Sequence, residues 1–132
     1  MLKYLLLPLL LLSSSAYAKD NPGQNLYTSR CAMCHGTDAR ATGPLAKSSN
    51  PPTPDLTSPA FRQRLALYPG VIVASIVLRP NGDLIPSTLK KNGVTLPGHV
   101  WTDRDLRAID RYIKALIDSN SVRPPKAAPG PG

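Results

Sequence analysis

The clearest hydrophobic pattern in the chain lies between residues 102 and 119. Its apolar residues recur every three or four positions, which is the spacing of one face of an α-helix. They are Leu106, Ile109, Tyr112, Ile113, Leu116 and Ile117. Thr102 is a favourable N-cap, and Asp103 and Asp105 follow in the first turn, where the helix dipole favours carboxylates. The pattern predicts an amphipathic helix near the end of the chain.

Three earlier segments also have the features of regular elements. Asn21–Pro22 fits an N-cap followed by a first-turn proline, so we expect a helix from there toward Cys31. Ser58–Pro59 predicts the start of a short helix that ends near Leu67. The continuous apolar run over residues 71–78 fits either a buried strand or a buried helix, and its periodicity does not distinguish the two.

Two long segments separate these elements. Glycine and proline recur through residues 36–58 and 79–101, so both segments are predicted to be ordered loops. Loops of this length in a small domain often wrap around something. Phe61 is the only phenylalanine and Trp101 the only tryptophan, so the core has few large apolar side chains. A large planar cofactor at its centre would supply the missing apolar surface.

The chain begins like an exported protein. Lys3 precedes an apolar run over residues 5–12, and a small-x-small stretch ends at Ala18. The run contains a proline and is too short to cross a hydrocarbon core of ~30 Å. We therefore expect residues 1–18 to be a signal peptide that directs the chain to the periplasm or another exported location. We expect one domain at residues 19–119, without a transmembrane segment, and a disordered proline-rich tail at residues 120–132.

The charge of the chain is strongly positive. It has 16 lysines and arginines against 8 acidic residues, and cleavage after Ala18 would lower the net charge from +8 to +7. An excess of this kind fits an anionic partner such as an acidic protein face or anionic lipid, or simply a solvated surface. Nucleic acid is not expected, because an exported protein rarely meets it and the basic residues are not clustered with aromatic ones.

The chemistry of the chain is concentrated at Cys31, Cys34 and His35. A Cys-x-x-Cys-His run is the attachment pattern of c-type haem. In a helical turn the two cysteines project from nearby faces, so each thiol can add to one vinyl group of the same porphyrin. His35 can then offer a ring nitrogen to the iron from the proximal side. The pattern predicts one covalently bound haem c.

Other uses of these residues are less consistent with the sequence. A dithiol/disulfide pair also uses Cys-x-x-Cys and would suit an exported protein, but it does not need His35. The chain also lacks the strand–helix alternation of thioredoxin-like proteins. Zinc would need His99 as a fourth ligand, and the adjacent Cys34 and His35 are awkward in one tetrahedron. A purely structural disulfide would leave the histidine without a role.

With these residues in place, the sequence resembles a small bacterial monohaem class I cytochrome c. Gly23 and Tyr27 are similar to the small residue and the aromatic residue on that family's first helix. Residues 96–106 resemble its distal loop and the start of its terminal helix, in which Tyr112 would pack against the Gly23/Tyr27 helix. Gly43–Pro44 resembles the proline whose neighbouring carbonyl commonly accepts a hydrogen bond from the proximal histidine.

The resemblance covers roughly residues 21–118, and its haem motif is its most specific part. It implies an all-α, cytochrome c-like fold of about three to five short helices joined by Pro/Gly-rich loops around one haem. Cys31 and Cys34 would form the thioether links, and His35 would be the proximal iron ligand.

The chain departs from the family pattern on the distal side of the haem. The family has a Met-Pro there, whose thioether is the sixth iron ligand, and this chain has Leu96 before the proline. Met1 would leave with the signal peptide, and Met33 lies in the attachment motif on the proximal side. No methionine is therefore expected to bind the iron, which predicts a reduction potential below that of ordinary family members.

Three interpretations of the distal site stay open at this point. His99, the only other histidine, could coordinate the iron if the loop shifts its register. Alternatively, His99 faces solvent and the iron is five-coordinate or holds water. Lys90 or Lys91 is a third candidate ligand. A vacant site would bind carbon monoxide or nitric oxide in the ferrous state.

Five side chains are candidates for contacts with the haem propionates. Trp101 and Tyr68 could donate hydrogen bonds, and Arg62, Arg64 and Arg79 could form ion pairs. Each also fits an ordinary role in core packing or surface solvation.

Two functions from different classes follow. The first is an electron carrier, or an electron-transfer subunit, that passes single electrons between redox partners; an acidic face on a partner protein or a membrane complex would suit its charge. The alternative is peroxide reduction or small-gas binding at an open or His-flanked iron, in which His99 could act as an acid/base group. Apart from the haem motif, no nucleophile or acid/base pair is visible in the sequence.

Overall fold

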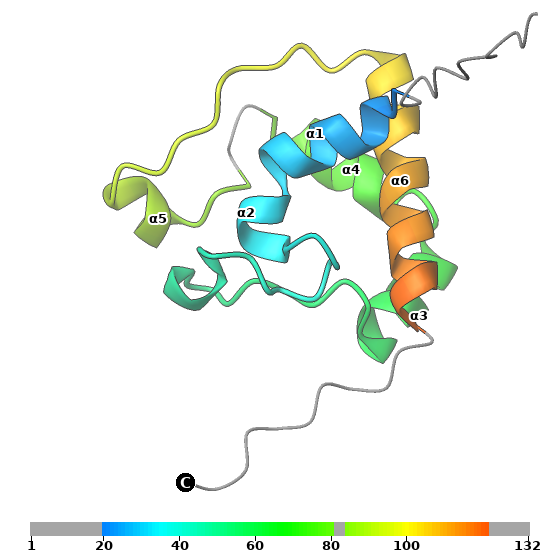
Figure 1. Ribbon diagram of the computed structural model, residues 1–132, viewed down its shortest axis with the longest axis horizontal. Helices are drawn as coiled ribbons and strands as arrows, with labels where there is room; N and C mark the ends of the chain where they lie inside the picture. Colours follow the sequence, from blue (N-terminus) through cyan, green and yellow to red (C-terminus); the bar gives the residue numbers. More distant parts are fainter. Residues whose placement is uncertain (1–19, 81–83, 122–132) are drawn as a thin grey trace, which may run out of the picture.

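The structure, a computed structural model, describes residues 20–80 and 84–121 (Figure 1). Within these ranges the chain forms six α-helices, one short 3₁₀ helix and no strand. They are α1 (Pro22–Arg30), α2 (Ala32–His35), η1 (Ala46–Ser48), α3 (Pro59–Leu67), α4 (Val71–Leu78), α5 (Ser87–Lys91) and α6 (Asp103–Ser121). The all-α fold class is thus confirmed.

The number of helices exceeds the three to five expected, because α2 and α5 are separate short helices. The chain bends at Cys31, which divides the attachment turn from α1. Helix α5 lies inside the segment 79–101 that was predicted to be loop throughout. At the other end, α6 continues to Ser121 and Asn120 is buried, so the helix extends two residues into the predicted tail. The predicted signal peptide and residues 122–132 lie outside the described residues.

Side-chain caps begin three of the helices where the sequence placed them. The Asn21 side chain accepts from the backbone N–H of Gln24 at 3.1 Å, and Ser58 accepts from Phe61 at 3.2 Å. A proline follows each of these two caps, where its missing N–H costs nothing. At the start of α6, the Thr102 hydroxyl accepts from the backbone N–H of Asp105 at 3.1 Å.

Helices α1 and α6 cross closely, as Figure 1 shows at the upper end of α6. Gly23 makes the crossing possible, because a Cβ at this position would collide with the Ala108 carbonyl and lie 2.8 Å from the Cβ of Tyr112. The rings of Tyr27 and Tyr112 pack with their centroids 5.5 Å apart. The predicted packing of Tyr112 against the Gly23/Tyr27 helix is therefore confirmed.

The core lies between α1, α4 and α6. Its buried members are Tyr27, Ala39, Leu56, Ile72, Ile76, Ile109, Ile113 and Ile117. The segment 71–78 is a helix rather than a strand: Ile72 and Ile76, four residues apart, are buried, whereas Val77 and Leu78 are 54% and 78% exposed. Alternation on a strand would have placed Ile72, Ala74 and Ile76 on one face, but Ala74 is exposed.

The first long loop, residues 36–58, is tied to the helices at several points. The Tyr27 hydroxyl donates to the Gly36 carbonyl at 2.5 Å. The Arg40 guanidinium donates to the Asn120 carbonyl at 2.8 Å, near the negative end of the α6 dipole. These two hydrogen bonds join the loop to α1 and to the C-terminal end of α6.

None of the helices in the described ranges is both long enough and apolar enough to cross a membrane on its own. Taken together, α3 and α4 pass the same test of length and composition, but their axes are bent by 88°.

Candidate functional site

A partly open cavity of about 100 Å³ is formed by the attachment turn, the end of α4 and parts of the segment 84–101. Its lining residues are Arg30, Cys31, Met33, Cys34, His35, Ile76, Arg79, Leu84, Ile85, Pro86, Leu96 and Trp101. The structure thus brings Cys31, Cys34 and His35 to one shared cavity.

Local hydrogen bonding places these three residues on one turn. The Cys31 N–H donates to the Tyr27 carbonyl, in the last turn of α1, at 2.8 Å. The chain then bends. The Cys31 carbonyl accepts from the N–H groups of Cys34, at 3.2 Å, and His35, at 2.9 Å. The turn ends at Gly36, whose φ of +74° is a conformation that glycine adopts readily.

The imidazole of His35 is oriented by a backbone carbonyl. Its Nδ1 lies 3.2 Å from the Pro54 carbonyl oxygen. Donation from Nδ1–H to this carbonyl leaves Nε2 as the nitrogen with a lone pair, which is what a metal requires. Burial lowers the pKa of His35, although the bond to Pro54 opposes this effect, so the ring is held in the neutral form.

The carbonyl that faces His35 is not the one predicted from the family resemblance. That resemblance placed it beside Gly43–Pro44, whereas the structure places it at Pro54, further along the same loop. Gly43 instead packs directly on the attachment turn, and a Cβ there would collide with the carbonyls of Ala32 and Met33. The Gly43 N–H donates to the Cys34 carbonyl at 3.1 Å. This stretch therefore supports the turn rather than the imidazole.

The thiols do not have the character of a redox-active pair. Both are free, and burial raises the pKa of Cys31 to about 11 and also raises that of Cys34. Dithiol oxidoreductases rely on a lowered thiol pKa. The zinc interpretation also fails, since the described residues contain no cluster of three or more His, Cys or Asp side chains able to hold a metal ion.

The residues that line the cavity suit a covalently attached haem in their chemistry. Two free thiols and a neutral imidazole share one wall, and the remaining walls are largely aliphatic, which suits the faces of a porphyrin. Arg30 and Arg79 provide positive charge at the cavity, where propionates would need it. When bound, the haem supplies the iron and its one-electron chemistry, and Cys31, Cys34 and His35 are the residues that would hold it.

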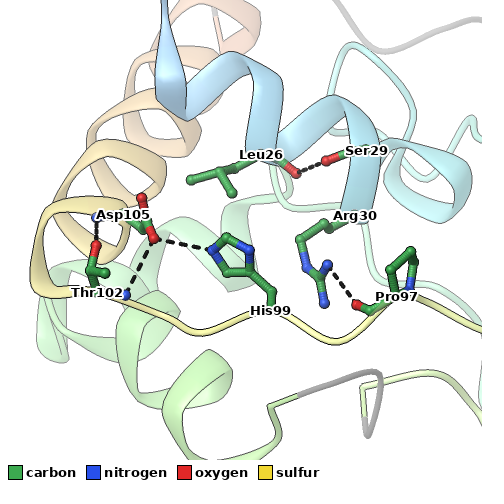
Figure 2. A network of polar contacts seen from close by, with 7 residues as sticks. All are labelled: Leu26, Ser29, Arg30, Pro97, His99, Thr102 and Asp105. Atoms are coloured by element: carbon green, nitrogen blue, oxygen red, sulfur yellow. Dashed lines mark hydrogen bonds and ion pairs between the residues drawn. The ribbon is translucent and has the colours of Figure 1, made fainter.

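Leu96 lies at the cavity, as the distal position of the family pattern implies, but His99 does not line it. Figure 2 shows the His99 ring turned toward the start of α6, where Nε2 lies 3.1 Å from the Asp105 carboxylate. Hydrogen bonds lower the pKa of Asp105, first from Thr102 and then from His99, and keep this carboxylate ionised. The structure therefore does not bring His99 to the cavity together with Cys31, Cys34 and His35.

The remaining candidates for iron binding and for propionate contacts also differ in whether they line the cavity. Lys90 and Lys91 are exposed on α5 and do not line the cavity. Of the five candidates for propionate contacts, Trp101 and Arg79 line it, whereas Tyr68 and Arg64 lie around a separate hollow between α3 and α4. Arg62 lines neither.

Sequence reasoning missed Arg30 and Pro54. Arg30 lines the cavity, donates to the Pro97 carbonyl at 2.9 Å and lies 5.5 Å from the centre of the Trp101 ring. Its position directly before Cys31 was the only available signal. Pro54 acts through its carbonyl, which every residue has, so no signal in the sequence could have identified it.

Comparison with known proteins gives one result. The family model described as Cytochrome c matches residues 21–116, which is most of the chain. Neither the comparison with curated proteins nor that with solved structures gives a match. The matched residues include the attachment turn, the cavity and most of α6. The chain therefore belongs to the cytochrome c family of haem-binding electron-transfer proteins.

Proposed function

We propose that this protein is an exported c-type cytochrome that carries single electrons between redox partners by means of one covalent haem. The observation that carries the proposal is the arrangement of Cys31, Cys34 and His35 on one turn at the wall of a largely apolar cavity. The two thiols would anchor the cofactor, and His35, oriented by Pro54, would provide the proximal nitrogen.

The cavity wall favours electron transfer over acid–base catalysis. Apart from the three attachment residues, its titratable side chains within the described ranges are Arg30 and Arg79. Arginine keeps its proton at any physiological pH and cannot serve as a general acid/base. His99, the group that peroxide chemistry would need, is engaged with Asp105 outside the cavity. A fixed, apolar environment of this kind suits outer-sphere transfer.

The charge around the site supports a negatively charged partner. Arg30 and Arg79 lie at the cavity, and Lys90 and Lys91 are exposed on the short helix α5 that follows its Leu84–Pro86 wall. A partner with an acidic face, either free or part of a membrane complex, would be steered to this side of the molecule. Export rests on the predicted signal peptide of residues 1–18.

The purified protein tests the proposal directly. Its mass should equal that of the chain from residue 19 onward plus one haem, and the pyridine haemochrome spectrum should show thioether-linked haem. A redox titration should follow a one-electron curve, and binding to an acidic redox partner should weaken as salt is added. A mass equal to that of the bare chain would refute haem attachment, and salt-independent binding would refute the acidic partner.

A further inference from the structure

The segment that crosses the distal side of the cavity is tied down on both sides of Gly98. From the side of α1, the Arg30 guanidinium donates to the Pro97 carbonyl at 2.9 Å. From the side of α6, the Asp105 carboxylate accepts from His99 Nε2 at 3.1 Å. Figure 2 shows both hydrogen bonds along the extended segment that leads to Thr102. Residues 92–102 form no helix, so these side chains provide much of what fixes their path.

The partner of His99 is itself held in place. The Thr102 N–H donates to the Asp105 carboxylate at 3.3 Å, and the Asp105 N–H donates to the Thr102 hydroxyl at 3.1 Å. This reciprocal pair is a capping box at the N-terminus of α6. The carboxylate is thus part of the end of the longest helix rather than a mobile surface group, and a side chain that binds it is anchored to that helix.

The imidazole has a second contact that fixes its plane. The ring of His99 meets the Trp101 ring edge to face, with centroids 4.7 Å apart and planes 73° apart. The Arg30 guanidinium also contacts Trp101, 5.5 Å from the centre of its ring. His99 is 29% exposed and Asp105 25% exposed, so the pair is partly shielded from water.

The hydrogen bond from His99 to Asp105 is incompatible with coordination of an iron by the same nitrogen, Nε2. To donate to Asp105, Nε2 must carry a proton, and a protonated ring nitrogen has no lone pair for iron. His99 also lies outside the cavity lining, whereas Leu96 and Trp101, which flank it in the sequence, are both part of that lining. Binding to the iron would require His99 to leave both Asp105 and Trp101.

We propose that His99 is a positioning residue that ties the distal loop to the start of α6 and so keeps Leu96 and Trp101 at the cavity, and that it does not bind the iron. This inference rests on haem attachment as proposed above, but it does not depend on the electron-carrier role.

Three variants within the loop, made in the haem-loaded protein, test this role first. His99→Gln keeps an N–H donor that can reach Asp105 but removes the imidazole. His99→Ala removes both. Val100→Ala is the matched control, because Val100 is in the same loop and 85% exposed.

Three readouts separate binding to iron from anchoring of the loop. The absorption spectrum reports the iron ligands. Trp101 is the only tryptophan of the chain and lines the cavity, so its fluorescence, quenched by a nearby haem, reports where the loop lies. The rate of limited proteolysis within residues 92–102 measures how often the loop opens.

We expect His99→Gln to keep the wild-type spectrum, fluorescence and cleavage rate. His99→Ala should partly restore Trp101 fluorescence and speed cleavage by roughly threefold to tenfold, the range that corresponds to one lost hydrogen bond. Asp105→Ala should have a similar effect, and the His99→Ala, Asp105→Ala double variant should cleave no faster than Asp105→Ala alone. Val100→Ala should leave all three signals unchanged.

Two results would overturn the inference. A change from low-spin to high-spin iron in both His99→Gln and His99→Ala would identify His99 as a ligand. Unchanged fluorescence and cleavage in His99→Ala would show that it anchors nothing. If the wild-type protein carries no haem, the proposed function fails, while the cleavage rates still test whether His99 holds the loop.

Discussion

The two histidines of the chain have different hydrogen-bond partners, and this difference assigns them different chemistry. His35 faces a neutral carbonyl, that of Pro54, and burial holds its ring neutral with one nitrogen for a metal. His99 faces a carboxylate, that of Asp105, which requires a proton on the nitrogen it binds. From the sequence alone both were candidate iron ligands, because residue type says nothing about the partner that a fold supplies.

At Leu96, substitution by methionine should restore the thioether that the family pattern places at this position. The exchange nearly conserves volume and should cost less than about 1.5 kcal/mol in stability. Because a thioether favours ferrous iron, the reduction potential should rise. A redox titration measures this, with Leu84→Met as the control, since Leu84 lines the same cavity without matching the distal position. Equal shifts in the two variants, or none in Leu96→Met, would contradict a distal location for Leu96.

Asp38 makes the stability of the first loop dependent on pH. Burial tends to raise the pKa of this carboxyl, but hydrogen bonds from the Thr42 hydroxyl at 2.6 Å and the Arg40 N–H at 3.0 Å outweigh it and lower the pKa. The folded state therefore favours the carboxylate. Its stabilising effect is present above the unfolded pKa of about 3.9 and is lost as the pH falls through the lower folded value.

The matching variant is Asp38→Asn, which keeps the shape of the side chain but does not titrate. Its stability deficit relative to the wild-type protein should be constant near neutral pH and should shrink as the pH falls below about 4. Chemical unfolding across that range measures the difference. A deficit that grows toward acid pH would show that the sign assigned to this group is wrong.

Among the helices, those with strong local signals were predicted well. Helix α3 begins and ends as expected, and α6 begins at its predicted cap, because cap residues and amphipathic periodicity are local properties. Helices α2 and α5 have only four and five residues, too few to show a period, so α5 was taken as loop. The attachment residues were predicted because their spacing is local. Arg30 was missed because its contacts are with Pro97 and Trp101, which are distant in the sequence, and Pro54 because it acts through its backbone carbonyl.

The crossing of α1 and α6 provides a test at the level of elements. Gly23→Ala should force the two helices apart, since its Cβ would meet the Ala108 carbonyl and Tyr112. Overpacking of this kind costs typically about 1–3 kcal/mol, so the variant should unfold at a lower temperature. Gln24→Ala, at the adjacent exposed position of α1, is the control and should change stability by less than about 0.5 kcal/mol. Similar Tm values for both variants would show that the crossing tolerates a methyl group.

In the molecule as a whole, the two long loops hold each other as well as the helices. The Asn50 N–H donates to the Thr88 hydroxyl at 3.2 Å, which joins the first loop to α5. Arg30 joins the second loop to α1, and Arg40 joins the first loop to the end of α6. The second loop thus forms one wall of the cavity and is joined to the first loop through Thr88, while the apolar core lies between α1, α4 and α6. The two long loops have few apolar side chains to pack on unless the cavity is filled.

Haem attachment should therefore be required for a compact fold. An unfilled cavity of about 100 Å³ would cost about 2.4 kcal/mol, at ~24 cal/mol per Å³, which is a large share of the roughly 5–15 kcal/mol that stabilises a typical domain. The Cys31→Ala, Cys34→Ala double variant, which cannot form either thioether, should lose compactness in size-exclusion chromatography and resistance to proteases. Each single variant keeps one possible link and should be intermediate. A double variant as compact and resistant as the wild-type protein would show that the helices alone sustain the fold and that the loops close without the cofactor.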